Sequence, residues 1–330
     1  MTATPQLLLR ALAAAAVCGA LLAAPATAQA AEKLRLLTSW YAQAEHGGFY
    51  EAKATGLYGK AGLDVEIRMG GPQVKGMQLL LAGEVDAILG YDLQVLDAVE
   101  KGLPAVTVAA SFQYDLQGMM THEDVRSLDD LKDRVILVST SGRTTWWPWF
   151  KAKYGADDAQ AKAYTFSLTP FFADPKIAQQ AYPSSEPFQA QEKGVPANFF
   201  LFAKEGYPPY GTTIVVTRKT LEEKRAAIGA FVKASMEGWR DYLGNPAPAN
   251  ALIKADNPKM TDAQIAFGIA KMKELGALDA EGRTSVGQMT GERWKATRDY
   301  MVGAGLLKAE ADWTKAFTTE FVKDLSVRLD

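Results

Sequence analysis

The chain has 330 residues, with 36 Lys and Arg side chains against 38 Asp and Glu, and a net charge of −2 at neutral pH. This near balance predicts no strongly basic surface, so we expect neither a nucleic-acid partner nor an anionic membrane surface as a binding partner. The length is enough for two ordinary domains.

Residues 1–30 have the pattern of a secretory signal peptide. An apolar, Ala-rich run extends over residues 11–24, and the small residues Ala28 and Ala30 mark a cleavage site. A permanent membrane anchor is the alternative, but roughly 14 apolar residues are short for a bilayer span. Cleavage after Ala30 removes Cys18, the single cysteine. We therefore expect a periplasmic protein that is stabilised by core burial rather than by disulfides.

Strand patterns alternate with helical patterns along the first two thirds of the chain. The predicted strands are residues 34–38, 63–68, 85–90, 106–112, 135–140, 164–168, 197–203 and 212–217. Between them, apolar residues recur at helical spacing, as at Leu93, Leu96 and Val99. This alternation predicts βαβ units, a parallel sheet and an α/β fold.

The strand and helix pattern restarts after Phe112 and returns to a strand near residue 212. We therefore predict two lobes with a cleft between them. Lobe 1 is expected to contain residues 33–111 and 212–330, and lobe 2 residues 112–211. From Leu221 onward the pattern is almost wholly helical, which predicts a helical C-terminal region.

The first strand-to-helix turn, TSWYAQAEHGGFY at residues 38–50, is rich in polar and aromatic side chains. Such turns lie at the carboxyl edge of an open α/β sheet, where ligands bind. Trp40 offers a flat face for stacking, Gln43 both donates and accepts, and Glu45 and His46 add polar groups. The alternative is that Trp40 is a core aromatic and His46 a helix-start residue. Together these residues favour a site.

Polar residues also follow later predicted strands. The candidate ligand contacts at these turns are Gly90, Tyr91, Asp92, Ser141, Arg143, Thr144 and Glu186. Ser141 and Thr144 at a helix start can present N–H and hydroxyl donors, although helix capping is the alternative. Asp92 and Glu186 can accept from an amine or a ring N–H, with helix capping and surface placement as the respective alternatives.

Motifs for hydrolysis and metal binding are missing from the sequence. It has no HExxH, GxSxG or Walker motif, no GxGxxG after the first strand, and only His46 and His122 as imidazole bases. His122 lies beside two acidic residues, where a surface connection is favoured over a metal site. We therefore predict that the protein is not an enzyme and holds no metal or cofactor.

Four stretches carry a family resemblance. They are SWYAQAEHGGFYEAKATGLYGKAGLDVEI, LLLAGEVDAILGYDLQVLDAVEKGLP, SLDDLKDRVILVSTSG and SEPF. With them, the chain resembles type II periplasmic solute-binding proteins of ABC transporters, in the branch of alkanesulfonate, nitrate and taurine binders and thiamine-pyrimidine precursor proteins. The resemblance implies that fold, a small-molecule ligand, a membrane permease as partner, and ligand contacts at the turn residues named above. We expect a monomer.

The aromatic and acidic residues suggest the kind of ligand. Trp40, Tyr91 and Trp146 supply more stacking surface than a nitrate or a small alkanesulfonate needs, and Asp92 and Glu186 would repel an anion. These groups favour a small flat nitrogen heterocycle such as a thiamine-pyrimidine precursor.

Two other ligand or function classes stay open. A sulfonate, nitrate or aromatic carboxylate held by Arg143 and the helix start at Ser141 is the first alternative. A pyrimidine-metabolism enzyme is the second, although the chain lacks the cysteine-rich segment of the pyrimidine synthases that the superfamily contains.

Overall fold

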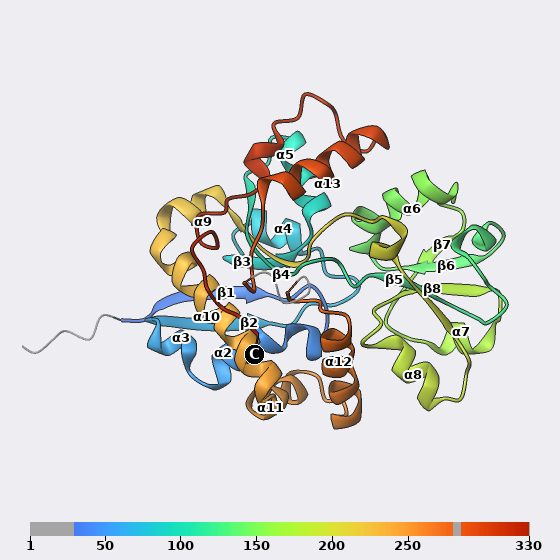
Figure 1. The fold of residues 1–330 in the computed structure, drawn as a ribbon, viewed down its shortest axis with the longest axis horizontal. Helices are drawn as coiled ribbons and strands as arrows, with labels where there is room; N and C mark the ends of the chain where they lie inside the picture. The colour runs from blue at the N-terminus through green and yellow to red at the C-terminus, as the bar shows by residue number, and fades with distance from the viewer. Residues whose placement is uncertain (1–29, 280–284, 330) are drawn as a thin grey trace, which may run out of the picture. The chain divides into compact units, whose positions relative to one another are not determined.

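A computed structural model describes residues 30–279 and 285–329 (Figure 1). Residues 1–29 of the predicted signal peptide lie outside the described residues. Glu32–Asp330 forms one compact unit, and within its described part no helix is both long enough and apolar enough to cross a membrane.

The first of two five-stranded sheets has the strand order β2-β1-β3-β10-β4. Its strands are β1 (Glu32–Leu37), β2 (Leu63–Arg68), β3 (Ala87–Gly90), β4 (Ala105–Phe112) and β10 (Gly211–Thr217). β1 is parallel to β2 and β3, but β10 is antiparallel to both β3 and β4. The predicted parallel pairing is confirmed for β1 with β2 and β3, whereas the antiparallel direction of β10 was not predicted. Gly211 pairs with Phe112, so the returning chain enters at the edge where β4 ends and must run in the opposite direction.

The second sheet has the order β7-β6-β8-β5-β9. Its strands are β5 (Gly118–Thr121), β6 (Val135–Val138), β7 (Ala161–Ala163), β8 (Ile177–Ala181) and β9 (Asn198–Leu201). The predicted strand at residues 164–168 is wrong, because β7 ends before it. Phe166 has a φ of 63°, in the left-handed region, which is incompatible with a continuing strand.

Helices and short 3₁₀ turns connect these strands. Those connected with the first sheet are η1 (Ala44–His46), α2 (Gly47–Ala54), α3 (Leu57–Lys60), α4 (Gly76–Leu81) and α5 (Asp92–Glu100). Those connected with the second sheet are η2 (Leu128–Leu131), η3 (Gly142–Thr144), α6 (Trp146–Tyr154), α7 (Thr169–Ala173), α8 (Glu186–Glu192) and η4 (Phe202–Glu205). The predicted helical C-terminal region is confirmed as α9 (Arg218–Glu223), α10 (Arg225–Gly244), α11 (Ala247–Asp256), α12 (Asp262–Glu274), α13 (Gly291–Gly303) and η6 (Trp313–Ala316).

Both faces of the first sheet are buried. Successive side chains of a strand point to opposite faces, so Leu36 joins a core with Phe49 and Trp239, whereas Leu37 joins a second core with Leu93. Figure 1 shows α2, α10 and α11 on one side of the sheet and α4, α5 and α13 on the other. This burial explains the continuous apolar sequences of β3 and β4, whereas β2 at the edge of the sheet alternates between buried and exposed residues.

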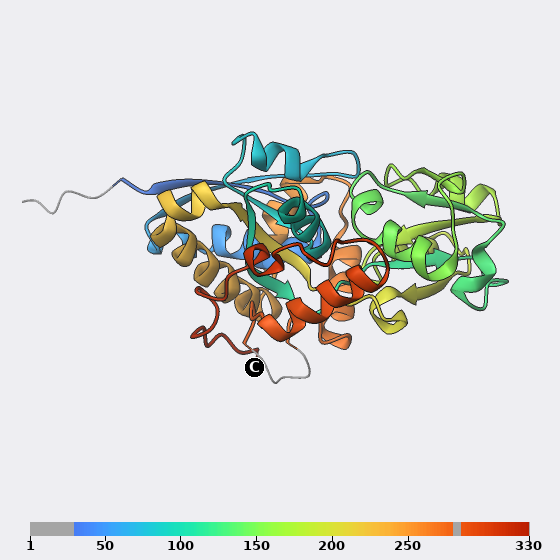
Figure 2. The ribbon, with the colours of Figure 1, turned by 90° about the horizontal axis from the view of Figure 1, so that it is seen from above.

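Two chain segments connect the sheets, one between β4 and β5 and one between β9 and β10. Figure 2 shows the elements of the second sheet as a group beside those of the first. The two segments touch where the Asp115 amide donates to the Pro209 carbonyl at 3.2 Å. Just beyond, Thr212 has a φ of 47°, a strained conformation for a β-branched residue. The division into lobes at residues 112 and 212 stays a prediction.

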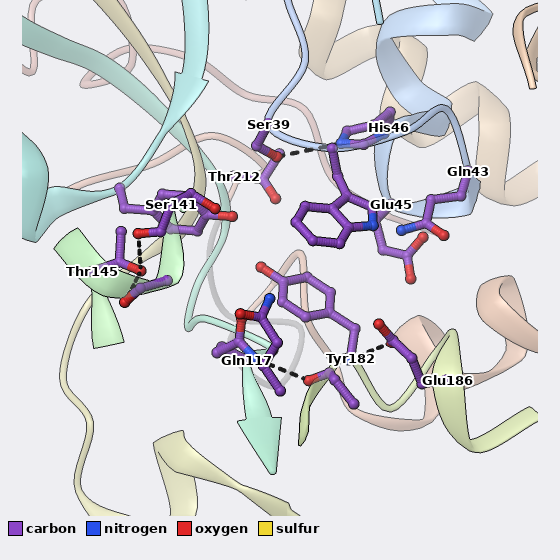
Figure 3. A pocket seen from close by; sticks show the side chains of 15 residues that line it. Ser39, Gln43, Glu45, His46, Gln117, Ser141, Thr145, Tyr182, Glu186 and Thr212 are labelled. Atoms are coloured by element: carbon purple, nitrogen blue, oxygen red, sulfur yellow. Dashed lines mark hydrogen bonds between the residues drawn. The ribbon is translucent and has the colours of Figure 1, made fainter. Parts of the chain in front are cut away.

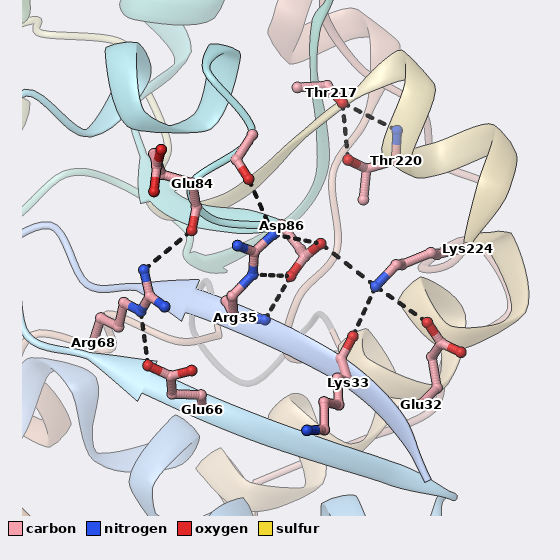
Figure 4. A network of polar contacts seen from close by, with 11 residues as sticks. Glu32, Lys33, Arg35, Glu66, Arg68, Glu84, Asp86, Thr217, Thr220 and Lys224 are labelled. Carbon is pink, nitrogen blue, oxygen red and sulfur yellow. Dashed lines mark hydrogen bonds and ion pairs between the residues drawn. The ribbon is translucent and has the colours of Figure 1, made fainter. Parts of the chain in front are cut away.

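A network of hydrogen bonds and ion pairs surrounds the start of β1 (Figure 4). The Arg35 backbone amide and Nε both donate to Asp86 Oδ2, at 2.8 and 2.9 Å. Lys224 Nζ lies 3.5 Å from Asp86 Oδ1 and 3.1 Å from Glu32 Oε1. Burial by itself raises the pKa of Asp86, but the hydrogen bonds from Arg35 and the charge of Lys224 outweigh it and lower that pKa. The network therefore joins β1, the start of β3 and the helix after β10.

Candidate functional site

A polar pocket lies where turns that follow strands of both sheets meet. Carboxyl ends of parallel strands are the usual ligand sites of α/β sheets, and β1, β3, β6 and β8 each supply a following turn. Figure 3 shows the side chains converging on the pocket. The lining residues are Ser39, Trp40, Gln43, Glu45, His46, Tyr91, Gln117, Ser141, Gly142, Thr145, Gln180, Ala181, Tyr182, Glu186 and Thr212.

Direct contacts between the two sides close this pocket. The Ser184 hydroxyl donates to Glu45 Oε1, and Ser185 Oγ donates to Gln43 Oε1 at 3.2 Å. The cavity volume is about 30 Å³, which is room for only one or two water molecules. A ring-sized ligand therefore does not fit into the pocket in this arrangement of its walls.

Acidic groups dominate the charge of the pocket. Glu186 is 4% exposed; its Oε1 accepts from the Tyr164 hydroxyl at 2.8 Å and its Oε2 from the Tyr182 amide at 2.9 Å. Burial raises the pKa of Glu186 to about 7. Burial also raises the pKa of Glu45, against a smaller lowering by the Ser184 hydrogen bond. No Lys or Arg is among the residues that line the described pocket, so nothing basic neutralises these carboxylates.

His46 adds a neutral polar group rather than a cation. Burial lowers the pKa of His46 to about 4, so the imidazole is uncharged at neutral pH. Its Nε2 lies 3.4 Å from Ser39 Oγ, at hydrogen-bonding distance. The pocket can thus accept hydrogen bonds at several places but offers no positive charge to an anion.

Aromatic rings from both sides surround the turn after β1. The Trp40 ring stacks on Tyr164, with centroids 6.0 Å apart and planes 19° apart, and meets Phe166 edge-on at 5.8 Å. Trp40 also lines the pocket. The indole therefore packs against two rings of the segment that follows β7, while it contributes to the wall of the pocket.

A hydrogen bond links the pocket to the connecting segments. The Tyr182 hydroxyl donates to Asp115 Oδ1 at 2.8 Å, and Asp115 lies on the segment between β4 and β5. Burial raises the pKa of Asp115 to about 6. A ligand that moves Tyr182 would thus act directly on a residue of a segment that connects the two sheets.

The structure brings most of the predicted ligand contacts together. Those that line the pocket are Trp40, Gln43, His46, Tyr91, Ser141 and Glu186. The surface alternative for Glu186 does not hold, because its carboxylate is buried. Contact of these residues with a ligand stays a prediction.

The other four predicted residues lie outside the lining. A Cβ at Gly90 would lie 2.9 Å from Val215 Cγ2, so this glycine serves strand packing. Asp92 is fully buried and its Oδ2 accepts from the Tyr210 amide at 2.9 Å. Arg143 is exposed, and its Nη2 donates to the Ala161 carbonyl at 3.0 Å.

Thr144 and Trp146 also face away from the lining. Thr144 is exposed; its hydroxyl donates to the Ser141 carbonyl at 3.1 Å and accepts from Gln94 at 2.9 Å. The capping alternative is not confirmed, because the starts of η3 and α6 have no side-chain capping hydrogen bond. Trp146 is 1% exposed and packs against Phe202, with ring centroids 5.2 Å apart. It is a core residue and not a stacking surface for a ligand.

Several lining residues were not predicted from sequence. Among them are Ser39, Gln117, Thr145, Gln180, Tyr182 and Thr212. Tyr182 begins the polar turn YPSSEP, which is a usable local signal. Gln117 and Thr212 lie at the ends of the connecting segments, where no periodicity indicates what they face.

His122 follows the surface alternative rather than a metal site. Its Nε2 lies 2.9 Å from the Phe171 carbonyl oxygen, and its ring stacks on the Phe171 ring at 4.1 Å. Across the described residues, no group of His, Cys, Asp and Glu is placed to hold a metal ion.

Comparisons with known proteins give a family and a fold. The family model described as NMT1/THI5 like matches residues 43–249. The riboflavin-binding protein RibY of Chloroflexus aurantiacus is 24% identical over 311 residues, which cover 91% of this chain and 88% of that protein. A formylaminopyrimidine-binding protein of Halalkalibacterium halodurans is 26% identical over 238 residues, covering 68% and 71% of the two chains.

Solved structures confirm the predicted fold. The alkanesulfonate-binding protein SsuA from Xanthomonas axonopodis pv. citri, bound to MOPS, superposes with a TM-score of 0.66 at 14% sequence identity. The match covers 87% of this chain and 98% of that one. At this identity the similarity shows a shared periplasmic binding protein fold and says nothing of the ligand.

Proposed function

Because the chain belongs to the NMT1/THI5-like family, we propose that it is an extracytoplasmic solute-binding protein of an ABC importer. The polar pocket is proposed to bind a small flat nitrogen heterocycle such as a thiamine-pyrimidine precursor. Two relatives support this ligand class, since their names specify riboflavin and formylaminopyrimidine, both of which contain flat nitrogen heterocycles.

The observation that carries the proposal is the charge of the pocket. Glu45 and Glu186 are its ionisable acids, His46 is neutral, and no basic side chain lines its described walls. Carboxylates accept hydrogen bonds from ring N–H and amino groups. Placed near a sulfonate or nitrate without a cation, they would repel it.

The anion alternative lacks the cation on which it depends. Arg143 is exposed, donates to the Ala161 carbonyl and does not line the pocket. Binding a sulfonate there would require a different arrangement of η3. The heterocycle proposal needs no such change.

The pyrimidine-metabolism enzyme is the alternative from another class. It differs from a binding protein in one measurable respect, because an enzyme returns a chemically altered ligand. Mass spectrometry of the ligand before binding and after release tests this directly. Recovery of an unchanged ligand supports a transport role.

We further propose that residues 33–111 with 212–330 and residues 112–211 are two lobes that open to admit the ligand. The contacts between Glu45 and Ser184 and between Gln43 and Ser185 join the two proposed lobes and would break on opening. With the signal peptide at residues 1–30, the mature protein would act as a monomer in the periplasm and deliver its ligand to a membrane permease.

Native mass spectrometry and thermal shifts with pyrimidines, flavins, sulfonates and aromatic acids test the ligand class. A ligand at about 100 times its Kd should add about 2.7 kcal/mol of stability. Trp40→Ala should remove most of this shift, whereas Arg143→Ala, an exposed control outside the pocket, should leave it. The opposite result would replace the heterocycle with an anion.

A further inference from the structure

The polar pocket adjoins a larger groove, which three of the predicted site residues, Tyr91, Ser141 and Thr144, also line. The groove lies between α4 and α5, at the carboxyl edge of the first sheet, and has a cavity volume of about 400 Å³. We propose that it is a second subsite that holds an apolar substituent of the bound solute. The inference rests on the proposed function and refines it, because the preferred solute is then a flat heterocycle with an alkyl or aryl extension.

Apolar side chains form the floor and walls of the groove. Leu37 and Ile88 are 4% and 2% exposed and lie on its floor, and Met77 of α4 is part of the wall. Leu103, at the end of the α5 segment, is 40% exposed, the largest exposure of a large hydrophobic residue in the described chain. Water released from such a surface favours an apolar occupant.

The groove is continuous with the polar pocket. Ser39, Tyr91 and Ser141 line both, so a molecule with its ring at the carboxylates can extend past these residues into the groove. The polar pocket has a volume of only about 30 Å³ in the closed form, against about 400 Å³ in the groove. Most of the space for a solute larger than a single ring is therefore on the apolar side.

Charged residues of the groove give no reason to expect an anion there. Lys101 is exposed and pairs with Asp97, with 2.7 Å between Lys101 Nζ and Asp97 Oδ2. Lys75 is exposed as well. Since the buried part of the groove is apolar, hydrocarbon and aryl groups suit it better than phosphate or carboxylate groups.

The groove is open beside Gly76 because glycine has no side chain. Gly76 is the first residue of α4, and a Cβ placed on it would lie 3.6 Å from Leu37 Cδ2 and 3.8 Å from Ile88 Cδ1. These are ordinary van der Waals distances, so alanine fits without strain. A larger side chain at this position would occupy the space above the floor of the groove without altering any residue of the polar pocket.

The test uses the mature protein and a matched ligand series. The probes are 4-aminopyrimidine and its butyl derivatives, each of which carries one butyl group on a different free ring carbon. The Kd of each probe is measured by isothermal titration calorimetry. At least one butyl isomer should bind about tenfold more tightly than the parent ring. Removing roughly half of a butyl chain from water is enough for this gain in affinity. Gly76→Leu should abolish the gain and leave the Kd of the parent within about twofold.

Gly59→Leu is the matched control, because a Cβ at this exposed helical glycine has nothing within 4 Å. It should keep the gain. If Gly76→Leu does not fold, Gly76→Ala should still reduce the gain by about threefold.

Three outcomes overturn the inference. If the parent binds but no butyl isomer binds more tightly, or if the gain survives in Gly76→Leu, the groove does not hold the solute. If no aminopyrimidine binds, parent included, while a sulfonate or carboxylate does, the proposed function fails and this inference fails with it.

Discussion

Glu186 shows how one side chain can decide between ligand classes. It is a buried acid whose two oxygens already accept hydrogen bonds from Tyr164 and Tyr182, so it acts in the pocket as an acceptor. Burial raises its pKa to about 7, and burial raises the pKa of Glu45 in the same direction. The pocket thus gains negative charge as the pH rises through about 7, where Glu186 ionises.

The pH dependence of affinity follows from this shift. A ligand that donates N–H groups stabilises the ionised carboxylate, so binding releases a proton and affinity rises with pH, by up to about tenfold per unit below about pH 7. An anionic ligand favours the protonated acid, so its affinity falls over the same range. Titration calorimetry between about pH 5.5 and 8.5 measures the slope. Glu186→Gln should flatten it, and a falling affinity in the wild type would contradict the heterocycle proposal.

Some residues of the pocket could be predicted from the sequence, and others could not. Trp40, Gln43 and His46 were predictable as pocket residues because a turn after a buried strand has to lie at the carboxyl edge of its sheet. Arg143 was not, since a long flexible side chain at a correctly predicted helix start can point in many directions. Thr212 gave no signal either, because its neighbours depend on how the two sheets face each other.

At the scale of the elements, local pattern gave the five strands of the first sheet but not all their directions, and it missed β5 and β8 of the second sheet. The strand at residues 212–217 is confirmed as β10, yet its antiparallel pairing depends on the chain returning beside Phe112, which periodicity does not record. The error at residues 164–168 has a local cause, the left-handed backbone of Phe166. Apolar alternation cannot reveal such a residue.

The network at the start of β1 predicts a stability effect for Asp86. Asp86→Ala removes the acceptor of the Arg35 amide and guanidinium and leaves Lys224 without one of its partners. Asp86 is 8% exposed, so we expect the free energy of unfolding to fall by about 2 to 3 kcal/mol, measured by urea titration.

Asp64→Ala, at an exposed position of the neighbouring strand β2, is the control and should change stability by less than about 0.5 kcal/mol. The pH dependence gives a second check. Because the folded pKa of Asp86 is lowered, its contribution is present above the unfolded pKa and is lost as the pH falls through the folded pKa. Equal effects of the two substitutions would show that the network does not stabilise the fold.

On the scale of the whole molecule, contacts between the two sheet groups define the closed form. Some lie in the pocket and others outside it. Among those outside, Phe188 of α8 and Phe267 of α12, both half-buried, have ring centroids 5.2 Å apart. α8 follows a strand of the second sheet, and α12 belongs to the helical region after β10. If the lobes open, this contact breaks without any change in the pocket.

The effects of substituting Phe188 and Phe267 on ligand affinity should therefore not be additive. A double-mutant cycle to alanine should give a coupling energy of about 0.5 to 1.5 kcal/mol in the binding free energy, the usual range for aromatic pairs. The reason is that the pair forms only in the closed form, which the ligand selects. Small-angle scattering should show that the double mutant is more open without ligand and compacts when ligand is added.

The pair Trp313 and Phe317 is the matched control. Both rings are half-buried, stack with centroids 6.0 Å apart, and lie together in the C-terminal segment after α13. Their coupling should appear in the free energy of unfolding and not in ligand affinity, because both rings belong to the same lobe and stay in contact when the lobes open. Two results would contradict lobe opening: equal coupling of the two pairs in ligand affinity, or the same scattering with and without ligand. In either case the two sheet groups move as one rigid body, and the ligand enters by local motion of the turns.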